Sequence, residues 1–441
     1  MAIYDDQTLE RIPPTLPQGE REHVLVFQDE SIFHTNEYRR RSWLAGDQQA
    51  IRKKGNGRVV HVSDFISETI GRIKLSEDQI AQQLTLPAEL RLPAFEARKI
   101  TYPGKGFDEW WDLNQLIDQL KHTIKVFEHT HPDSVGIFVF DRSSAHEGFA
   151  QNALNVHNMN VNPGNNQRRL RDTVVPLSNP GPAPGEEDTR GQVQKMCFPD
   201  DHPDPELRGK PKGMKVVLQE RKSVWAKYTT LCDERGTKVV RKCKSCTKSQ
   251  SRKDAERRVM LAEAAGQGDA PSAEDVIGAD SVTPPTSDDE WCCMQRVLSL
   301  QEDFRTEKPL IQSLIEEAGH ICLFLPRFHC ELNPIEMLWG YGKHRTYTSL
   351  AHMVYALPWP SGYRNLADGR FAMAKDLVPQ CLDSCELITI RKFFQKCWRY
   401  LDAYRNGLNA QQAALANKKY KSHRKIGLPS DITPSMGASD A

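Results

Sequence analysis

The chain has 441 residues, a length that suits one large domain or about two to three ordinary ones. Its 59 basic and 58 acidic residues nearly cancel, so overall charge selects no partner, while a mean hydropathy of -0.60 predicts polar insertions beside the folded parts. There is no apolar run of about 18 residues and no secretory leader, and the 11 scattered cysteines form no disulfide framework, so we expect neither a membrane span nor secretion.

The first part of the chain predicts a flexible lead-in, residues 1–21, followed by antiparallel strands. Residues 23–35, HVLVFQDESIFHT, are rich in β-branched and aromatic side chains, and indicate a strand that ends at Asp29, a turn and a second strand. A third strand is expected over 38–44. A Gly-Asn-Gly turn then introduces another strand within 55–67, which completes an antiparallel meander.

A helix, a buried strand and a long insertion come next. The apolar residues of 107–128 fall on one helical face. Residues 134–146 contain an apolar run that stops at Asp141, typical of a strand buried on both faces. The insertion, 162–290, is rich in Pro, Gly and charge. It is first basic and then, over 259–290, acidic, so its second part is expected to be disordered.

Folded sequence resumes after the insertion. Helices, a strand over 320–326, a helix over 333–345 and a helical C-terminal part over about 386–420 are expected. Without the insertion, this order predicts one compact α/β domain with helices flanking a mixed sheet. The segments are the lead-in (1–21), the first part of the core (22–161), the insertion (162–290), the second part of the core (291–350) and a helical, basic C-terminal region with a tail (351–441).

Three acidic residues occupy corresponding places in this pattern. Asp29 and Asp141 end strands, and Glu336 lies on the first turn of the helix after the last strand. Strand ends are where open α/β sheets bind ligands, and a cation offsets the cost of burying carboxylates. Three converging carboxylates suit Mg²⁺ ions that act on a phosphodiester. Taken singly, each acid has a plainer explanation, as a turn former, a helix cap or a partner of the helix dipole.

Three stretches, VLVFQDESIFH, FVFDRSSAH and FHCELNPIEMLWG, resemble the acidic blocks of the mariner-like branch of DDE transposases, and the Leu-Asn-Pro-Ile-Glu helix start is the most specific of them. The resemblance covers residues 23–67, 107–160 and 291–425, and it extends to an uncharacterised fungal group of DDE superfamily endonucleases. It implies an RNase H-like fold, a nuclear protein, and metal-dependent cleavage and strand transfer of DNA. The catalytic carboxylates, which would bind two Mg²⁺ or Mn²⁺ ions, are then Asp29, Asp141 and Glu336.

The resemblance also bears on neighbouring residues. Glu30 is expected on the opposite face of its strand from Asp29, in a structural role. His146 is expected near the substrate phosphate or, alternatively, as a packing or capping residue. Asn333 is a second candidate near the substrate, and with Pro334 it is expected to set the turn into the helix.

The chain departs from the family in two ways. The separation of Asp141 and Glu336 is much wider than usual, which we attribute to an insertion that can loop out of the core. The segment before Asp29 is too short for the N-terminal helix-turn-helix region of the family. Autonomous transposition is therefore not expected, and a catalytically silent or domesticated DNA-binding protein on the same fold is the alternative to an active endonuclease.

Four cysteines flank the predicted linker. Cys243 and Cys246 have the C-x2-C spacing of zinc knuckles, and Cys292 and Cys293 could supply two more thiolates, with Cys232 as a spare candidate. Four thiolates can hold a structural Zn²⁺ ion. Adjacent cysteines do not readily chelate one ion in relaxed geometry, so unligated thiols are the alternative.

Basic residues of the C-terminal region predict contacts with DNA phosphates. The run KKYKSHRK also has the composition of a nuclear-import signal, and a solvated charged face is the plain alternative. No membrane partner is expected, and homo-oligomerisation stays open. The predicted DNA-binding residues are Lys418, Lys419, Lys421, Arg424 and Lys425.

Overall fold

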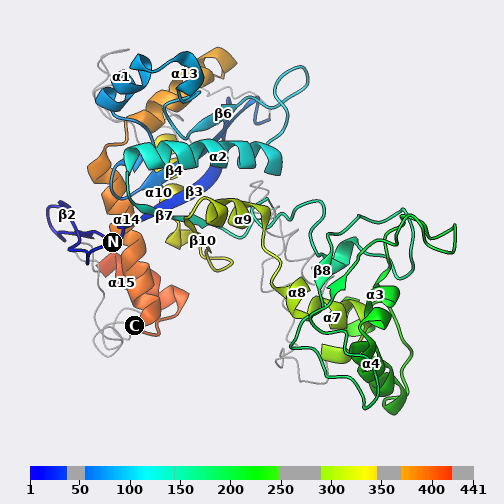
Figure 1. Ribbon diagram of the computed structural model, residues 1–441. Helices are drawn as coiled ribbons and strands as arrows, with labels where there is room; N and C mark the ends of the chain where they lie inside the picture. Colours follow the sequence, from blue (N-terminus) through cyan, green and yellow to red (C-terminus); the bar gives the residue numbers. More distant parts are fainter. Residues whose placement is uncertain (37–54, 144, 248–289, 345–368, 420–441) are drawn as a thin grey trace, which may run out of the picture. The chain divides into compact units, whose positions relative to one another are not determined.

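A computed structural model describes the chain except for residues 37–54, 144, 248–289, 345–368 and 420–441 (Figure 1). The strand predicted over 38–44 lies outside the described residues, as does the linker predicted over 259–290 except for its last residue. The chain forms two compact units. Unit 1 consists of Met1–Gly148 and Pro309–Ala441, and unit 2 consists of Phe149–Lys308.

Unit 1 is built on a mixed sheet, as predicted. The strands follow the order β10-β7-β3-β4-β5, and β6 also pairs with β4. The central strand β3 is parallel to β7 and antiparallel to β4, while β7 is parallel to β10. The strands are β3 (His23–His34), β4 (Val59–Ser67), β5 (Gly71–Arg72), β6 (Lys99–Thr101), β7 (Val135–Phe140) and β10 (Ile321–Phe324).

Strand β3 continues beyond the residue at which we expected it to end. It runs from His23 to His34 without interruption, so Asp29 lies inside the strand and no turn follows it. The prediction was wrong because local polarity suggested a break, whereas the backbone of this polar stretch stays paired with β4, Asp29 opposite Asp64. Pairing with a long neighbouring strand thus outweighs the weak strand preference of Asp and Glu.

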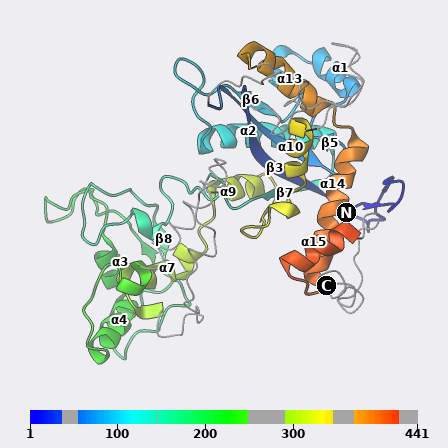
Figure 2. The same ribbon diagram turned by 180° about the vertical axis from the view of Figure 1, so that it is seen from behind.

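Helices cover both faces of the sheet (Figures 1 and 2). One apolar cluster joins the sheet to α2 (Leu113–Thr130) and α9 (Leu310–Glu317). The other joins it to α10 (Pro334–His344), α13 (Phe371–Asp383) and α14 (Leu387–Arg405). The helix predicted over 107–128 begins only at Leu113, because Asp112 caps it with a reciprocal Gln115 bond, and Trp110 lies exposed outside it.

The remaining elements of unit 1 lie around this sandwich. The lead-in, expected to be flexible, forms a hairpin of β1 (Ile3–Tyr4) and β2 (Arg11–Ile12). Arg391 of α14 donates to the Leu9 carbonyl at 3.0 Å, and Tyr4 and Leu9 are buried, which explains why this polar segment is ordered. The other helical elements are α1 (Glu77–Thr85), η1 (Ala88–Leu90), η4 (Cys330–Leu332) and α15 (Ala410–Lys419).

Unit 2 has its own apolar core and is larger than the insertion we predicted over 162–290. Residues on both sides of that range, among them Leu154 and Leu298, are buried in the same cluster as Val217 and Tyr228. The boundaries therefore differ because contacts between distant segments, invisible in local composition, define the unit. Its elements are η2 (Val156–Asn158), β8 (Thr173–Val174), β9 (Val193–Gln194), α3 (Met214–Glu220), α4 (Lys222–Glu234), α7 (Met294–Ser299) and α8 (Glu302–Arg305).

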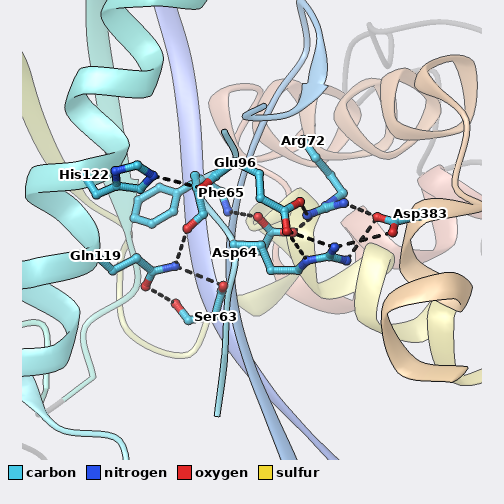
Figure 3. A network of polar contacts seen from close by, with 10 residues as sticks. Ser63, Asp64, Phe65, Arg72, Glu96, Gln119, His122 and Asp383 are labelled. Atoms are coloured by element: carbon cyan, nitrogen blue, oxygen red, sulfur yellow. Dashed lines mark hydrogen bonds and ion pairs between the residues drawn. The ribbon is translucent and has the colours of Figure 1, made fainter. Parts of the chain in front are cut away.

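A buried ionic network joins three elements of unit 1 (Figure 3). The Arg72 guanidinium on β5 binds Asp64 of β4 at 2.6 Å, Glu96 at 2.9 Å and Asp383 at the end of α13. The Asp64 side chain has no exposed surface. An unpaired charge is costly at this buried position, so an ionised Asp64 needs the Arg72 guanidinium as its partner.

Replacing Arg72 by methionine should lower the free energy of unfolding of unit 1 by about 3 kcal/mol or more, because Asp64 would stay buried without its cation. The matched variant Arg327→Met removes the cation of a far more exposed pair with Glu147, and should cost about 1 kcal/mol or less. Chemical denaturation followed by circular dichroism measures both values. Equal losses in the two variants would contradict this account of the network.

Candidate metal sites

The register between β3 and β7 places Asp29 beside Asp141. The last pair of these parallel strands is Phe27 with Val139, so two residues further along each chain Asp29 comes level with Asp141. Phe27 and Val139 both belong to the apolar cluster under α10. Since side chains alternate along a strand, Asp29 points to this same face. Asp141 directly follows β7, and its charge acts on both Asp29 and Glu336.

Helix α10 brings the third acid to this position. Pro334 opens the helix, Ile335 and Leu338 are fully buried against the sheet, and Glu336 lies on the first turn. The indole Nε1 of Trp339 donates to Asp29 Oδ2 at 3.1 Å. The predicted residue Asn333 also ties the helix entry to β3, because its Nδ2 donates to the Gln28 carbonyl at 3.3 Å.

The three carboxylates interact electrostatically. Burial, followed by the negative charges of Glu336, Glu30 and Asp141, raises the pKa of Asp29 well above its ordinary value. The Glu336 side chain keeps access to solvent, yet partial desolvation and the charge of Asp141 raise its pKa as well, while the charge of Lys343 and a hydrogen bond with Asp29 oppose the shift. The site is therefore an accumulation of negative charge that a bound cation would relieve.

Among the described residues, the sulfurs of the four cysteines in unit 2 lie close enough together to hold one metal ion, whereas the carboxylate oxygens of these three acids do not form such a group. Carboxylate oxygens are the ligands that Mg²⁺ and Mn²⁺ prefer. The donor chemistry of the site thus matches hard divalent cations.

A buried histidine links Asp141 to Glu30. His146 Nδ1 lies 2.5 Å from Asp141 Oδ1, and its Nε2 lies 3.4 Å from Glu30 Oε1. A carboxylate on each ring nitrogen favours donation from both, which is the hydrogen-bonding pattern of an imidazolium. Burial opposes that charge, but the bonds to Asp141 and Glu30 raise the pKa of His146 to about 10. Burial likewise opposes ionisation of Glu30, and His146 with Gln28 lowers its pKa to about 2.

Glu30 is itself held on the α2 face of the sheet. Its Oε1 accepts hydrogen bonds from Gln28 Nε2 at 2.9 Å and from Trp111 Nε1 at 3.1 Å. Gln28 also donates to Ser63, whose hydroxyl binds Gln119 of α2 at 2.7 Å (Figure 3). We expected Glu30 to be structural only. Its connection to Asp141 through His146 was missed, although the Asp-Glu pair and the nearby His were the available signals.

The predicted DNA-binding residues lie at the edge of the described chain. Lys418 is exposed near the end of α15, and Lys419 is the last residue of that helix. Lys421, Arg424 and Lys425 lie outside the described residues. Lys418 is therefore the only one of the five predicted residues whose side chain the described part of the structure places.

Four cysteine sulfurs come together in unit 2. Cys292 Sγ lies 3.5 Å from Cys243 Sγ, 3.6 Å from Cys246 Sγ and 3.8 Å from Cys293 Sγ, and Cys293 Sγ lies 3.9 Å from Cys246 Sγ. All four ligand atoms lie within 4.8 Å of one another, so the group could bind a metal ion such as zinc. The spare candidate Cys232 is not part of this group.

Comparisons with known proteins do not identify the chain. No protein-family model, no curated protein and no solved structure matches it. In the part of the chain that the structure describes, no helix is both long and apolar enough to cross a membrane. The three acids of unit 1 and the four cysteines of unit 2 are therefore the features that bear on function.

Replacing the carboxylate by the corresponding amide should change the free energy of unfolding in opposite directions at Asp29 and at Glu30. Folding raises the pKa of Asp29, so the folded protein retains a proton that the unfolded chain releases, and stability falls as pH rises from about 4 through the raised pKa. The variant Asp29→Asn cannot ionise, so it does not lose stability in this way, and its side-chain oxygen can still accept the hydrogen bond from Trp339. At pH 7 without metal it should raise the free energy of unfolding by about 1 to 3 kcal/mol.

Glu30→Gln provides the matched comparison. Because folding lowers the pKa of Glu30 to about 2, its charge stabilises the protein above the unfolded pKa of about 4.3, and this stability is lost as pH falls toward 2. The variant should therefore lose about 1 to 3 kcal/mol at pH 7. Denaturation in EDTA at several pH values measures both variants, and a stabilised Glu30→Gln or destabilised Asp29→Asn would contradict the assignment.

Proposed function

We propose that the protein is a transposase-derived DDE endonuclease, which cleaves and transfers DNA phosphodiesters with two Mg²⁺ or Mn²⁺ ions held by Asp29, Asp141 and Glu336. What carries this proposal is the convergence of three acids from two parallel strands and a facing helix, where burial and neighbouring negative charges raise the pKa of Asp29 and Glu336. Such charge accumulation is uncommon in a purely structural role and typical of metal-dependent phosphoryl chemistry.

The arrangement of unit 1 supports an RNase H-like fold as part of this proposal. A long central strand is antiparallel to the next strand and parallel to β7, which in turn is parallel to β10. Helices cover both faces, and the acids come from the central strand, the end of its parallel neighbour and a helix. This is the placement that the resemblance to mariner-like transposases implies.

The residues of the site would hold the metal ions and fix their ligands. Trp339 orients the Asp29 carboxylate, and His146 orients that of Asp141. Asp141 and Glu336 remain accessible enough to meet a substrate, since the Asp141 side chain is 48% exposed. When bound, the two ions supply the activation of an attacking water or hydroxyl and the stabilisation of the leaving oxygen.

In the same proposal, Glu30 is a positioning residue. It holds one nitrogen of His146 while Asp141 binds the other, so the ring is fixed between a structural and a metal-binding carboxylate. Partners of this kind set the orientation of metal ligands and typically contribute about 10- to 100-fold to metal affinity.

The nuclease proposal predicts metal-dependent nicking of DNA. The purified chain should convert supercoiled plasmid to open circles with Mg²⁺ or Mn²⁺, and Asp141→Asn should fall to the metal-free background because a ligand is lost. Asp118→Asn, which changes an exposed acid on α2, should retain full activity. The lack of any divalent-dependent cleavage in the wild type would favour a silent DNA-binding protein, and preferential cleavage of RNA–DNA hybrids would redirect the proposal to RNA.

The positioning role of Glu30 predicts a metal-specific defect. Glu30→Gln should raise the Mn²⁺ concentration for half-maximal cleavage by about 10- to 100-fold, with much of the activity restored at high Mn²⁺. A Mn²⁺ titration of the nicking rate measures this shift. If the rate falls by the same factor at every Mn²⁺ concentration, Glu30 does not act through the metal ligand.

A further inference from the structure

The four sulfurs in unit 2 have the spacing of a tetrahedral single-metal site. Zinc–thiolate bonds of about 2.3 Å place the sulfurs of a regular tetrahedron about 3.8 Å apart. Four of the six sulfur–sulfur separations run from 3.5 to 3.9 Å, and all six lie within 4.8 Å. We propose that Cys243, Cys246, Cys292 and Cys293 bind one structural Zn²⁺ ion, which clamps together two segments of unit 2.

The adjacent cysteines meet this geometry, although their sequence spacing argued against it. Cys293 has an extended backbone, with φ of -165° and ψ of 159°, and precedes α7 directly. Its side chain is fully buried, yet its sulfur lies 3.8 Å from that of Cys292. Both sulfurs also reach Cys246, at 3.6 and 3.9 Å, so the pair contributes two corners rather than one.

Contacts that do not involve thiols hold the two segments in place. The backbone N–H groups of Met294 and Gln295, at the start of α7, each donate at 3.0 Å to the carbonyls of Val240 and Arg241. The buried Tyr228 of α4 places its hydroxyl 3.5 Å from the Val240 carbonyl. The segment before Cys243 is thereby docked on α7 independently of any metal, which makes the convergence of the sulfurs a property of the fold.

A bond within the C-x2-C turn also suits a metal-bound thiolate. The Cys246 N–H donates to Cys243 Sγ at 3.4 Å. Such N–H···S bonds favour the ionised sulfur that a metal requires. Four thiolates around Zn²⁺ leave two negative charges, and residues 235–247 contain five Lys or Arg residues and no acid. Local charge therefore compensates the complex.

The spacing favours one zinc ion over an iron–sulfur cluster. In a cluster, different thiolates bind different irons, so the sulfurs lie farther apart than around a single ion. Here all four lie within 4.8 Å of one another. With four protein ligands, a tetrahedral zinc ion has no open position, which makes the site structural rather than catalytic.

The test is the metal content of the full chain purified in reductant. Mass spectrometry of the metals should find one zinc per chain in the wild type, and Cys246→Ser and Cys292→Ser should each lose it. Cys197→Ser, which alters a cysteine of unit 2 outside the group, should retain zinc. Absence of zinc, replacement of zinc by iron, or zinc retained in both cluster variants would overturn the proposal.

A second measurement keeps the proposal testable if a serine variant fails to fold. Wild-type chain stripped of metal and titrated with Co²⁺ should develop the intense near-ultraviolet charge-transfer absorption of a thiolate-bound ion, saturating at one equivalent. Zinc should abolish the absorption, whereas excess Mg²⁺ should leave it unchanged. Absorption without thiolate character, or its loss on adding Mg²⁺, would contradict the site. This outcome is independent of DNA cleavage, so it stands or fails separately from the proposed endonuclease.

Discussion

The pairing of β3 with β7 is the constraint on which the carboxylate site depends. Register alone sets Asp29 level with Asp141, because Phe27 and Val139 form the last pair before them. The apolar contacts of Ile335 and Leu338 then fix α10 on the same face, so that Glu336 arrives beside the two aspartates. A slip of β3 by one residue would reverse the faces and place Glu30, not Asp29, under the helix.

Neighbouring acidic side chains on the two faces of this sheet have pKa values shifted in opposite directions. On the α10 face, burial and three neighbouring acids raise the pKa of Asp29, although Lys343 acts on Glu336 and His146 binds Asp141. On the α2 face, Glu30 is paired with a buried imidazolium and its pKa is lowered. Elsewhere in unit 1, Arg72 compensates Asp64 directly. In the proposed function, the face that carries Asp29 is the one that would bind an external cation, since stability is commonly sacrificed at functional sites.

Much of this arrangement could be predicted from local sequence, and some of it could not. The mixed sheet with flanking helices followed from apolar runs and helical spacing. The predicted length of β3 was wrong because the polarity of Gln28 to Ser31 does not reveal that their backbone pairs with β4. The bounds of unit 2 depend on Leu154 and Leu298 sharing one core, which composition does not reveal. The bridge from Glu30 through His146 to Asp141 depends on side-chain geometry, which residue spacing leaves undetermined.

The most direct test of the central claim is the anomalous diffraction of crystals soaked in Mn²⁺. The account predicts manganese peaks between the carboxylates of Asp29, Asp141 and Glu336, and none in crystals of Asp141→Asn. The four cysteines provide an internal control, because a zinc peak there would show that bound metals are detectable in the same crystal. Manganese absent from the three acids in a crystal whose zinc is visible would contradict the carboxylate metal site.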